Sequence, residues 1–269
     1  MSDGHTMAQL DDPQLKIDVS FQPVSGITSL EAGPAPSCVP SEVSVWGVIL
    51  DGSPTCLDRC LGWLNQDERI RAERFVRDED RRRFIFAHGC VRSILGRYLD
   101  MDPARIEFLH GDSGKPSVSH VCIDGLPMSF NLSHAGGRAL IAISRGREVG
   151  IDLEHVRAEV EVEKLAGRYF AHSERVVING LEQQDRGARF FRYWVCKEAV
   201  LKAQGLGLQA LSQCEILLGT NGISAEVVVP LGSQLKNNWN VRLLACGEGW
   251  EAAVVSEGTD WIVQTALGR

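Results

Sequence analysis

The order of strand and helix patterns constrains this chain most, because a similar order begins a second time. In the first occurrence, alternating apolar residues predict a strand over residues 42–50, and apolar residues at helical spacing predict helices at about 65–78 and 80–99. Three shorter strands are expected next, at residues 106–109, 130–134 and 139–144. The pair Gly136-Gly137 predicts a turn between the last two.

The second occurrence begins with an expected strand at residues 149–154. Its helices are expected near residues 161–170, 172–182 and 187–203, and its closing strands at 214–218, 225–229, 241–245 and 251–255. This arrangement predicts an α+β fold built from two halves of similar plan. No residue-level repeat accompanies it, so a duplication is inferred from the order of elements alone.

The first 40 residues differ from the rest of the chain. They hold five of the ten prolines and show little apolar periodicity, so we expect a flexible or loosely docked extension over residues 1–40. An N-terminal α+β half is then expected over residues 41–148 and a C-terminal α+β half over residues 149–269.

Composition argues against several kinds of partner. The net charge of -7 and the pI of about 5.5 give no bulk attraction to nucleic acid or to an anionic membrane. No apolar run is long enough to span a membrane, and residues 1–14 have no apolar signal-peptide core. The eight cysteines lack zinc-ligand spacing and are expected to be reduced. We therefore expect a cytoplasmic protein.

Two acids stand close together in the strand expected at residues 149–154. Residues two apart share a face of a strand, so Asp152 and Glu154 project together while Ile151 and Leu153 turn to the other side. Side-by-side carboxylates repel unless a proton or a cation lies between them, and an oxygen-rich pair suits a hard ion such as Mg²⁺. The alternative is an exposed strand face with two solvated acids.

A third acid lies in the helix expected at residues 187–203. Glu198 and Lys202 are one turn apart and face the same side of that helix. They are either a surface ion pair of small energy or a metal ligand with a cation beside the same anionic ligand. The glycines Gly205 and Gly207 predict the end of the helix.

Three further patterns carry candidate polar groups. Ser133 and His134 follow an apolar strand and could hold a phosphate, although a lone histidine is more often structural. Lys115 stands between Gly114 and Pro116 on an expected loop, in a pattern that is not a Walker A motif. Glu174, next to Ser173, is either a first-turn helix residue or a general base.

Arginines gather between residues 69 and 83, with acids interleaved. The segment is either a solvated helix face or an anion site. There is no Gly-x-Ser-x-Gly elbow in the chain, which disfavours a serine hydrolase.

The joint order of these motifs resembles the 4'-phosphopantetheinyl transferase superfamily. The order is Gly-Lys-Pro, Asn-Leu-Ser-His, Val-Gly-Ile-Asp-x-Glu, Phe-x-x-x-Glu and Trp-x-x-Lys-Glu-Ala-x-x-Lys-x-x-Gly-x-Gly. The resemblance covers roughly residues 43–260, and its length is similar to the Sfp type. It implies two halves in a pseudo-twofold arrangement, each a small, mostly antiparallel sheet with packed helices, in a monomer.

The resemblance also implies roles for individual residues. Asp152, Glu154 and Glu198 would ligate Mg²⁺ in the C-terminal half, and Glu174 would be the catalytic base. Lys202 would hold the pyrophosphate of coenzyme A. Five other residues would also bind coenzyme A around this site: Arg83, Lys115, Ser133, His134 and Lys197. Within the run 81–83 the register is ambiguous, and Arg74 is a weaker candidate.

The implied reaction moves the phosphopantetheine arm of coenzyme A to a serine of an apo acyl or peptidyl carrier protein and releases 3',5'-ADP. Fatty acid, polyketide, nonribosomal peptide and siderophore carriers all stay open. A metal-dependent phosphohydrolase, or a non-catalytic module that binds coenzyme A or a carrier, are the alternatives. Many relatives carry a lysine where this chain has Leu206, which removes a positive charge.

Overall fold

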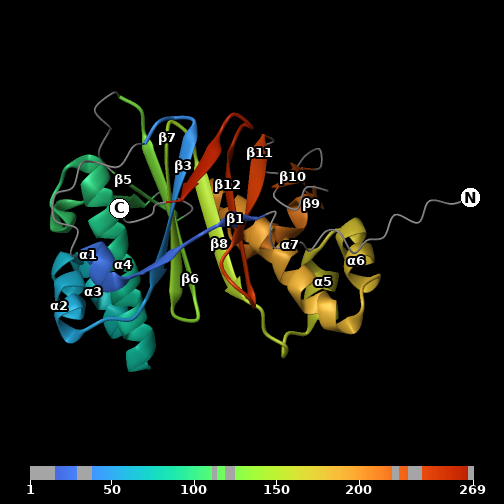
Figure 1. Cartoon of the computed structure of the whole chain (residues 1–269), viewed down its shortest axis with the longest axis horizontal. Coiled ribbons are helices and arrows are strands. Elements are labelled where there is room, and N and C mark those ends of the chain that lie inside the picture. The colour runs from blue at the N-terminus through green and yellow to red at the C-terminus, as the bar shows by residue number, and fades with distance from the viewer. Residues whose placement is uncertain are drawn as a thin grey trace, which may run out of the picture.

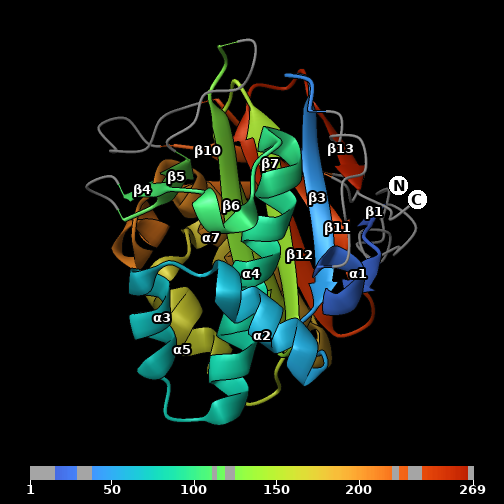
Figure 2. The same cartoon turned by 90° about the vertical axis from the view of Figure 1, so that its left-hand side faces the viewer.

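Four layers make up the fold, and the two sheets form the inner layers (Figure 1). The structure is a computed structural model that describes residues 16–28, 38–110, 114–118, 125–219, 224–229 and 238–265. Helices α1 to α4 cover the outer face of one sheet, and helices α5 to α7 cover the outer face of the other. Figure 2 shows α2 and α4 in front of the strands of the sheet that α1 to α4 cover, with α3 beside them.

The first sheet has the strand order β13-β3-β7-β6, with β2 also beside β3. Its antiparallel centre consists of β3 (Glu42–Ile49), β7 (Arg138–Arg145) and β6 (Met128–Ala135). The strands β2 (Phe21–Pro23) and β13 (Ile262–Thr265) run parallel to β3. A separate small pair joins β4 (Phe108–His110) to β5 (Pro116–Val118), and only Pro116 of β5 falls within the loop expected at residues 111–116.

The second sheet has the strand order β8-β12-β11-β10-β9. All neighbours in this path are antiparallel, and β1 (Ile17–Asp18) adds parallel to β11. The strands of the path are β8 (Val149–His155), β9 (Glu215–Leu218), β10 (Ser224–Val228), β11 (Trp239–Ala245) and β12 (Trp250–Glu257). The prediction of an α+β fold with mostly antiparallel sheets is confirmed.

The helices of the first half are α1 (Val24–Thr28), α2 (Pro54–Trp63), α3 (Gln66–Glu73) and α4 (Asp78–Leu99), followed by the 3₁₀ turn η3 (Pro103–Arg105). Those of the second half are α5 (Val162–Tyr169), α6 (His172–Asn179) and α7 (Gln183–Gln204), followed by the 3₁₀ turn η4 (Leu208–Gln213). Sequence periodicity missed α2, which Ser53 caps and Pro54 begins.

The two halves share a plan. In the first half, β3 pairs antiparallel with β7, and in the second half, β8 pairs antiparallel with β12. Each places a helix of 22 residues, α4 or α7, against the outer face of its sheet. The arrangement agrees with the two similar halves expected from the order of the elements.

The ends of the described chain cross between the halves. Strand β1 joins the second sheet, and β13 joins the first. Residues 16–28, which fall within the extension expected at residues 1–40, form β1, β2 and α1, and the side chains of Val24 and Ile27 are completely buried. The expectation of a loosely docked segment is therefore wrong for residues 16–28, because two short strands and one helical turn are too short to show a periodic pattern. Residues 1–15 and 29–37 lie outside the described residues.

Candidate active site

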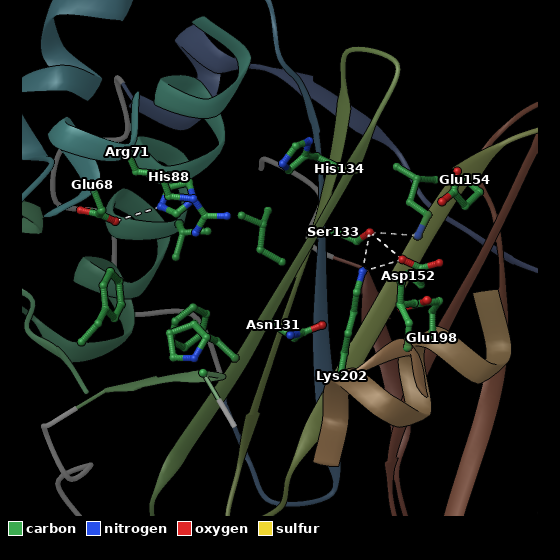
Figure 3. A pocket seen from close by; sticks show the side chains of 18 of the residues that line it. Glu68, Arg71, His88, Asn131, Ser133, His134, Asp152, Glu154, Glu198 and Lys202 are labelled. Carbon is green, nitrogen blue, oxygen red and sulfur yellow. Dashed lines mark hydrogen bonds and ion pairs between the residues drawn. The ribbon is translucent and has the colours of Figure 1, made fainter. Parts of the chain in front are cut away.

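A cavity of about 710 Å³ lies where the edge strands β6 and β8 of the two sheets meet. Helices α3 and α4 of the first half line one end, and α7 of the second half lines the other (Figure 3). The cavity contains His134 and Ser133 from β6, Asp152 and Glu154 from β8, and polar residues of both helical layers. Both halves of the chain therefore contribute to one site.

Side chains join the two sheets beneath this cavity. The amide oxygen of Asn131 accepts a hydrogen bond from the backbone N–H of Ile151 at 2.9 Å, and Ser133 Oγ accepts one from the N–H of Leu153 at 3.2 Å. These bonds satisfy backbone donors at the edge of β8, where an unpaired buried N–H would be costly. Ser133, predicted to lie beside a phosphate, is thus a connector between the sheets and is 5% exposed.

A glycine allows β8 to approach α7 closely. A Cβ atom on Gly150 would lie 2.0 Å from the carbonyl oxygen of Ala199 and 2.5 Å from the nitrogen of Ala203. Only a residue without a side chain permits this contact between a strand and the backbone of a helix. The close packing brings the acids of β8 next to Glu198 on α7.

Asp152 occupies the centre of a polar network. Its side chain is buried, and its Oδ1 accepts hydrogen bonds from Lys202 Nζ at 2.6 Å and from Ser133 Oγ at 2.8 Å (Figure 3). Lys202 Nζ also donates to Ser133 Oγ at 3.1 Å. Among the described residues, the second carboxylate oxygen, Oδ2, is buried without a hydrogen-bond partner. A buried carboxylate oxygen without a donor is unfavourable, so Oδ2 calls for a cation or proton.

Burial and mutual repulsion raise the pKa values of the two acids next to Asp152. Burial raises the pKa of Glu198 to about 7, with a further contribution from the negative charge of Asp152. Burial and the charge of Asp152 also raise the pKa of Glu154. The three predicted metal ligands therefore lie close enough to repel one another, and a cation between them would relieve that repulsion.

This donor set fits a hard divalent cation, although the side chains are not closed around one. Within the described ranges, no three His, Cys, Asp or Glu side chains form a ready-made metal cluster. The ammonium group of Lys202 lies against Asp152 and supplies the positive charge there. The free Oδ2 of Asp152 and the oxygens of Glu154 and Glu198 are the ligand type that Mg²⁺ prefers.

At the other end of the cavity, α3 and α4 contribute Arg71 and His88 together with the acids Asp67 and Glu68, and this end is named the cationic end after the positive charges that act on His134. Burial lowers the pKa of His134, and the positive charges of His88, Lys202, Arg71 and Arg83 lower it further. The ring of His134 thus lies close to several positive charges, and a bound phosphate group would offset the repulsion between them. His134 lines the cavity, and its contact with a phosphate stays a prediction.

Arg83 lies behind the turn that follows His134. Its guanidinium pairs with Glu79 at 2.5 Å and lies close to Gly137, and it is not among the residues that line the cavity. It therefore acts on the cavity through its charge.

Lys115 does not point into the cavity. Its Nζ donates to Glu148 Oε2 at 2.5 Å and to the backbone oxygens of Val149 at 3.1 Å and Ala203 at 2.8 Å. These three bonds occupy all the donors of an ammonium group. The prediction that this side chain holds a nucleotide is contradicted, because it ties the start of β8 to the end of α7.

Glu174 and Lys197 form a buried pair away from the cavity. Lys197 Nζ lies 3.0 Å from Glu174 Oε2 and donates to the carbonyl oxygens of Leu211 and Cys214, and the two side chains are 0% and 1% exposed. Glu174 also accepts from the backbone N–H groups of Ala171 and Ile216, each at 2.7 Å. Glu174 is therefore not placed to act as a base, nor Lys197 to bind coenzyme A, and the structure corrects both predictions.

Sequence reasoning did not single out three residues that line the cationic end: Glu68, Arg71 and His88. Glu68 completes a capping box with Asn65 at the start of α3. His88 lies one turn after Phe84 on α4, on the side that faces the cavity. Their proximity depends on the packing of α3 against α4, which the sequence pattern does not report.

In the part of the chain that the structure describes, no helix has the length and apolar character needed to cross a membrane.

Comparison with known proteins finds two matching family models. The model described as 4'-phosphopantetheinyl transferase superfamily matches residues 148–255, and the model described as 4'-phosphopantetheinyl transferase, N-terminal, matches residues 52–145. The two matches together include the acids of β8, the helix α7 and the cationic end of the cavity.

Individual proteins show the same similarity. The 4'-phosphopantetheinyl transferase HetI of Nostoc sp. is 36% identical over 234 residues, which cover 87% of this chain and 95% of that protein. The 4'-phosphopantetheinyl transferase Sfp of Bacillus subtilis is 28% identical over 62% of this chain and 72% of its own length. Among solved structures, the Thermotoga maritima holo-acyl-carrier-protein synthase aligns with a TM-score of 0.34 and 25% identity over 42% of this chain and 63% of that chain.

Proposed function

The chain belongs to the 4'-phosphopantetheinyl transferase superfamily, and from this premise we propose that it transfers the phosphopantetheine arm of coenzyme A to a serine of an apo acyl or peptidyl carrier protein, with Mg²⁺ as the metal and 3',5'-ADP as the second product. The observation that supports this most is the cavity itself. It holds three carboxylates and Lys202 at one end, and Arg71 and His88 beside two acids at the other, which suits a substrate that bridges a metal and several phosphates.

Asp152, Glu154 and Glu198 are the residues that would hold Mg²⁺. When bound, the ion would neutralise charge on the diphosphate and act as a Lewis acid towards its oxygens. The buried Oδ2 of Asp152 supports this assignment because it has no partner among the described residues.

Lys202 supports the same site from the side of α7. Its ammonium group contacts Asp152 and remains 30% exposed, so it can also face an anionic ligand in the cavity. A diphosphate repels an approaching nucleophile, and Lys202 and His134 would offset that negative charge. Neither residue needs to move far, since both already line the cavity.

The reaction balances as a phosphoryl-centre substitution. The serine oxygen of the carrier forms a bond to the β-phosphorus of coenzyme A, and the bond from that phosphorus to the bridging oxygen of 3',5'-ADP breaks. The serine loses one proton. Because Glu174 lies buried beside Lys197, we propose that a carboxylate or a neutral histidine that lines the cavity receives that proton.

A single chain supplies every group in this scheme. The acids and Lys202 come from the second half, and His134 comes from the first. We therefore propose that the monomer is active and that coenzyme A binds across the boundary between the two halves, where β6 and β8 meet.

The test is a transfer assay with purified protein, coenzyme A and a panel of apo carrier proteins. We expect a mass gain of one phosphopantetheine group on the carrier, one equivalent of 3',5'-ADP, and loss of both when EDTA removes the metal, with recovery on adding Mg²⁺. Release of free phosphopantetheine without a carrier would instead identify a hydrolase. Binding of coenzyme A with no turnover on any carrier would contradict the proposal.

A further inference from the structure

The first segment of the chain that the structure describes spans both halves. We call residues 16–28 the N-terminal clasp, which consists of β1, β2 and α1. Strand β1 runs parallel to β11 of the second sheet, and β2 runs parallel to β3 of the first. Figure 1 shows the blue ribbon that runs from α1, beside the helices of the first half, to β1 at the second sheet. The two matching family models cover residues 52–145 and 148–255, so neither assigns the clasp a role.

One end of the clasp is part of the core of the first half. The side chains of Val24 and Ile27 are 0% exposed and pack in the cluster beneath α4. Ser93 Oγ of α4 donates to the carbonyl oxygen of Ile27 at 3.0 Å, and Arg59 of α2 donates to that of Thr28 at 3.0 Å. The α1 end of the clasp is therefore anchored by both burial and hydrogen bonds.

The other end of the clasp is anchored in the second half. Lys16 Nζ lies 2.7 Å from Glu251 Oε2, and Arg192 Nη2 of α7 lies 3.0 Å from Glu251 Oε1. Glu251 of β12 lies directly opposite Glu154 of β8 in the antiparallel register, on the same face of the sheet. The clasp thus helps to neutralise a buried acid that is the cross-strand neighbour of a proposed metal ligand.

The middle of the clasp reaches the turn between β6 and β7 through a row of contacts. The guanidinium of Arg138 lies 4.9 Å from the ring centroid of Phe21 and 4.6 Å from that of Trp250. The ring of Trp250 in turn lies 3.0 Å from the position of a Cβ atom on Gly136. Gly136 belongs to the turn that directly follows β6, the strand that contributes His134 to the cavity.

We infer that the N-terminal clasp is a positioning device that fixes the two halves relative to each other and thereby keeps the cavity in the geometry that a ligand touching both halves needs. The cavity lies between β6 of one half and β8 of the other, so a small shift between the sheets changes the distances across it. A ligand that touches one half alone does not depend on that alignment. This role goes beyond the proposed function, although its ligand test uses coenzyme A and so rests on that function.

The variant Gly47→Ala disturbs the clasp without removing it. Gly47 lies on β3, and an added Cβ atom would be 2.7 Å from the carbonyl oxygen of Ser20 and 3.0 Å from Val19 Cγ1. Such contacts are too short to persist, so the clasp must shift away from β3. Gly47 is not among the described residues that line the cavity. Gly167→Ala on α5 is the matched control, because its Cβ atom would meet nothing within 4 Å.

Two variants of Phe21 test the clasp from its own side. Phe21→Ala removes the ring that packs on Arg138, and Phe21→Tyr keeps it. We expect Phe21→Ala to behave like Gly47→Ala in every measurement and Phe21→Tyr to behave like wild type. Agreement between Gly47→Ala and Phe21→Ala would exclude an effect that belongs to one position alone.

Calorimetry on the full-length protein compares a ligand of both halves with a ligand of one. Coenzyme A is the first, and Mn²⁺ alone is the second, because the three proposed metal ligands all come from β8 and α7. We expect Gly47→Ala to weaken coenzyme A binding by about fivefold or more, the lower end of the usual coupling between separate sites. Its Mn²⁺ affinity should stay within about twofold of wild type.

Amide hydrogen exchange followed by mass spectrometry gives a readout that needs no ligand. In Gly47→Ala we expect faster exchange in residues 16–28 and in the turn after β6, and in Gly167→Ala we expect the exchange of wild type. The backbone N–H of Val19, which donates to the carbonyl oxygen of Ala245 at 3.0 Å, is one of the amides that should lose protection.

Several results would overturn the inference. One is an equal loss of coenzyme A and Mn²⁺ affinity, which indicates general damage to the fold. Another is unchanged coenzyme A affinity in a variant whose clasp exchanges faster, and a third is unchanged exchange in both Gly47→Ala and Phe21→Ala. A wild-type protein that binds no coenzyme A would refute the proposed function instead. Exchange in the turn after β6 would then decide the role of the clasp: faster exchange supports it, and unchanged exchange contradicts it.

Discussion

The buried pair of Lys197 and Glu174 offers the sharpest test of how the second half is built. Replacing Lys197 by Met removes the ammonium group and leaves the carboxylate of Glu174 inside the protein, 1% exposed, with only two backbone N–H donors. At the 3.0 Å separation of the pair, Coulomb's law with an effective dielectric constant of about 20 gives an attraction of roughly 5 kcal/mol. Removing one partner of such a pair typically costs about 3–5 kcal/mol.

We therefore expect Lys197→Met to lower the free energy of unfolding by about 3–5 kcal/mol. For a chain of this size, that loss corresponds to a fall in Tm of roughly 6–20 °C. Urea unfolding followed by far-ultraviolet circular dichroism measures the free energy, and a thermal scan measures Tm. In the double variant Lys197→Met with Glu174→Gln no buried charge is left unpaired, so we expect it to be about 1–2 kcal/mol more stable than Lys197→Met alone.

The same variants separate a structural from a catalytic role. Folded Glu174→Gln protein, assayed well below its Tm, should transfer phosphopantetheine with kcat within about threefold of wild type, since removal of a true general base costs about a hundredfold or more. Two results would refute the reasoning. One is a Lys197→Met protein as stable as wild type, and the other is a Glu174→Gln protein of normal stability that has lost its turnover.

Three other predictions follow from the site and its supports. Glu198→Gln should lower transfer by about a thousandfold while Tm is retained, as measured by the carrier mass-shift assay, because one of three metal ligands is lost. Gly150→Ala should cost about 3 kcal/mol or more in urea unfolding, since its Cβ would lie 2.0 Å from the Ala199 carbonyl oxygen. Burial raises the pKa of Glu68, but the bonds from His88 and the Asn65 N–H and the charge of Arg92 outweigh it, so the net shift is downward. The ionised Glu68 carboxylate stabilises the fold at pH values above its unfolded pKa of 4.5, and this stabilisation is lost as the pH falls through the folded pKa. The difference in free energy of unfolding between wild type and Glu68→Gln should therefore narrow from pH 6 to pH 3, as measured by urea titrations.

Local geometry explains what was predictable about the site. The alternation of a strand puts Asp152 and Glu154 on one face whatever the rest of the chain does. The turn of a helix does the same for Glu198 and Lys202. The structure adds that all four line one cavity, and the order of motifs along the chain had already indicated this family.

Residues adjacent in sequence show the limit of local reasoning. Lys197 precedes Glu198 directly, yet on a helix the two side chains point about 100° apart. One meets the buried Glu174 and the other meets the cavity. The motif that contains both residues reports that they belong together, but not that one of them stabilises the fold and the other faces the ligand.

The amino-acid sequence alone therefore determined the α+β class, the two halves and the acids that face one another along single elements. Only the tertiary structure decided that Lys115 ties β8 to α7, that residues 16–28 join the sheets, and that Glu68 meets His88. The reason is physical: periodicity reports which face of an element is buried, whereas the partner across a packing interface depends on how elements far apart in the chain come together.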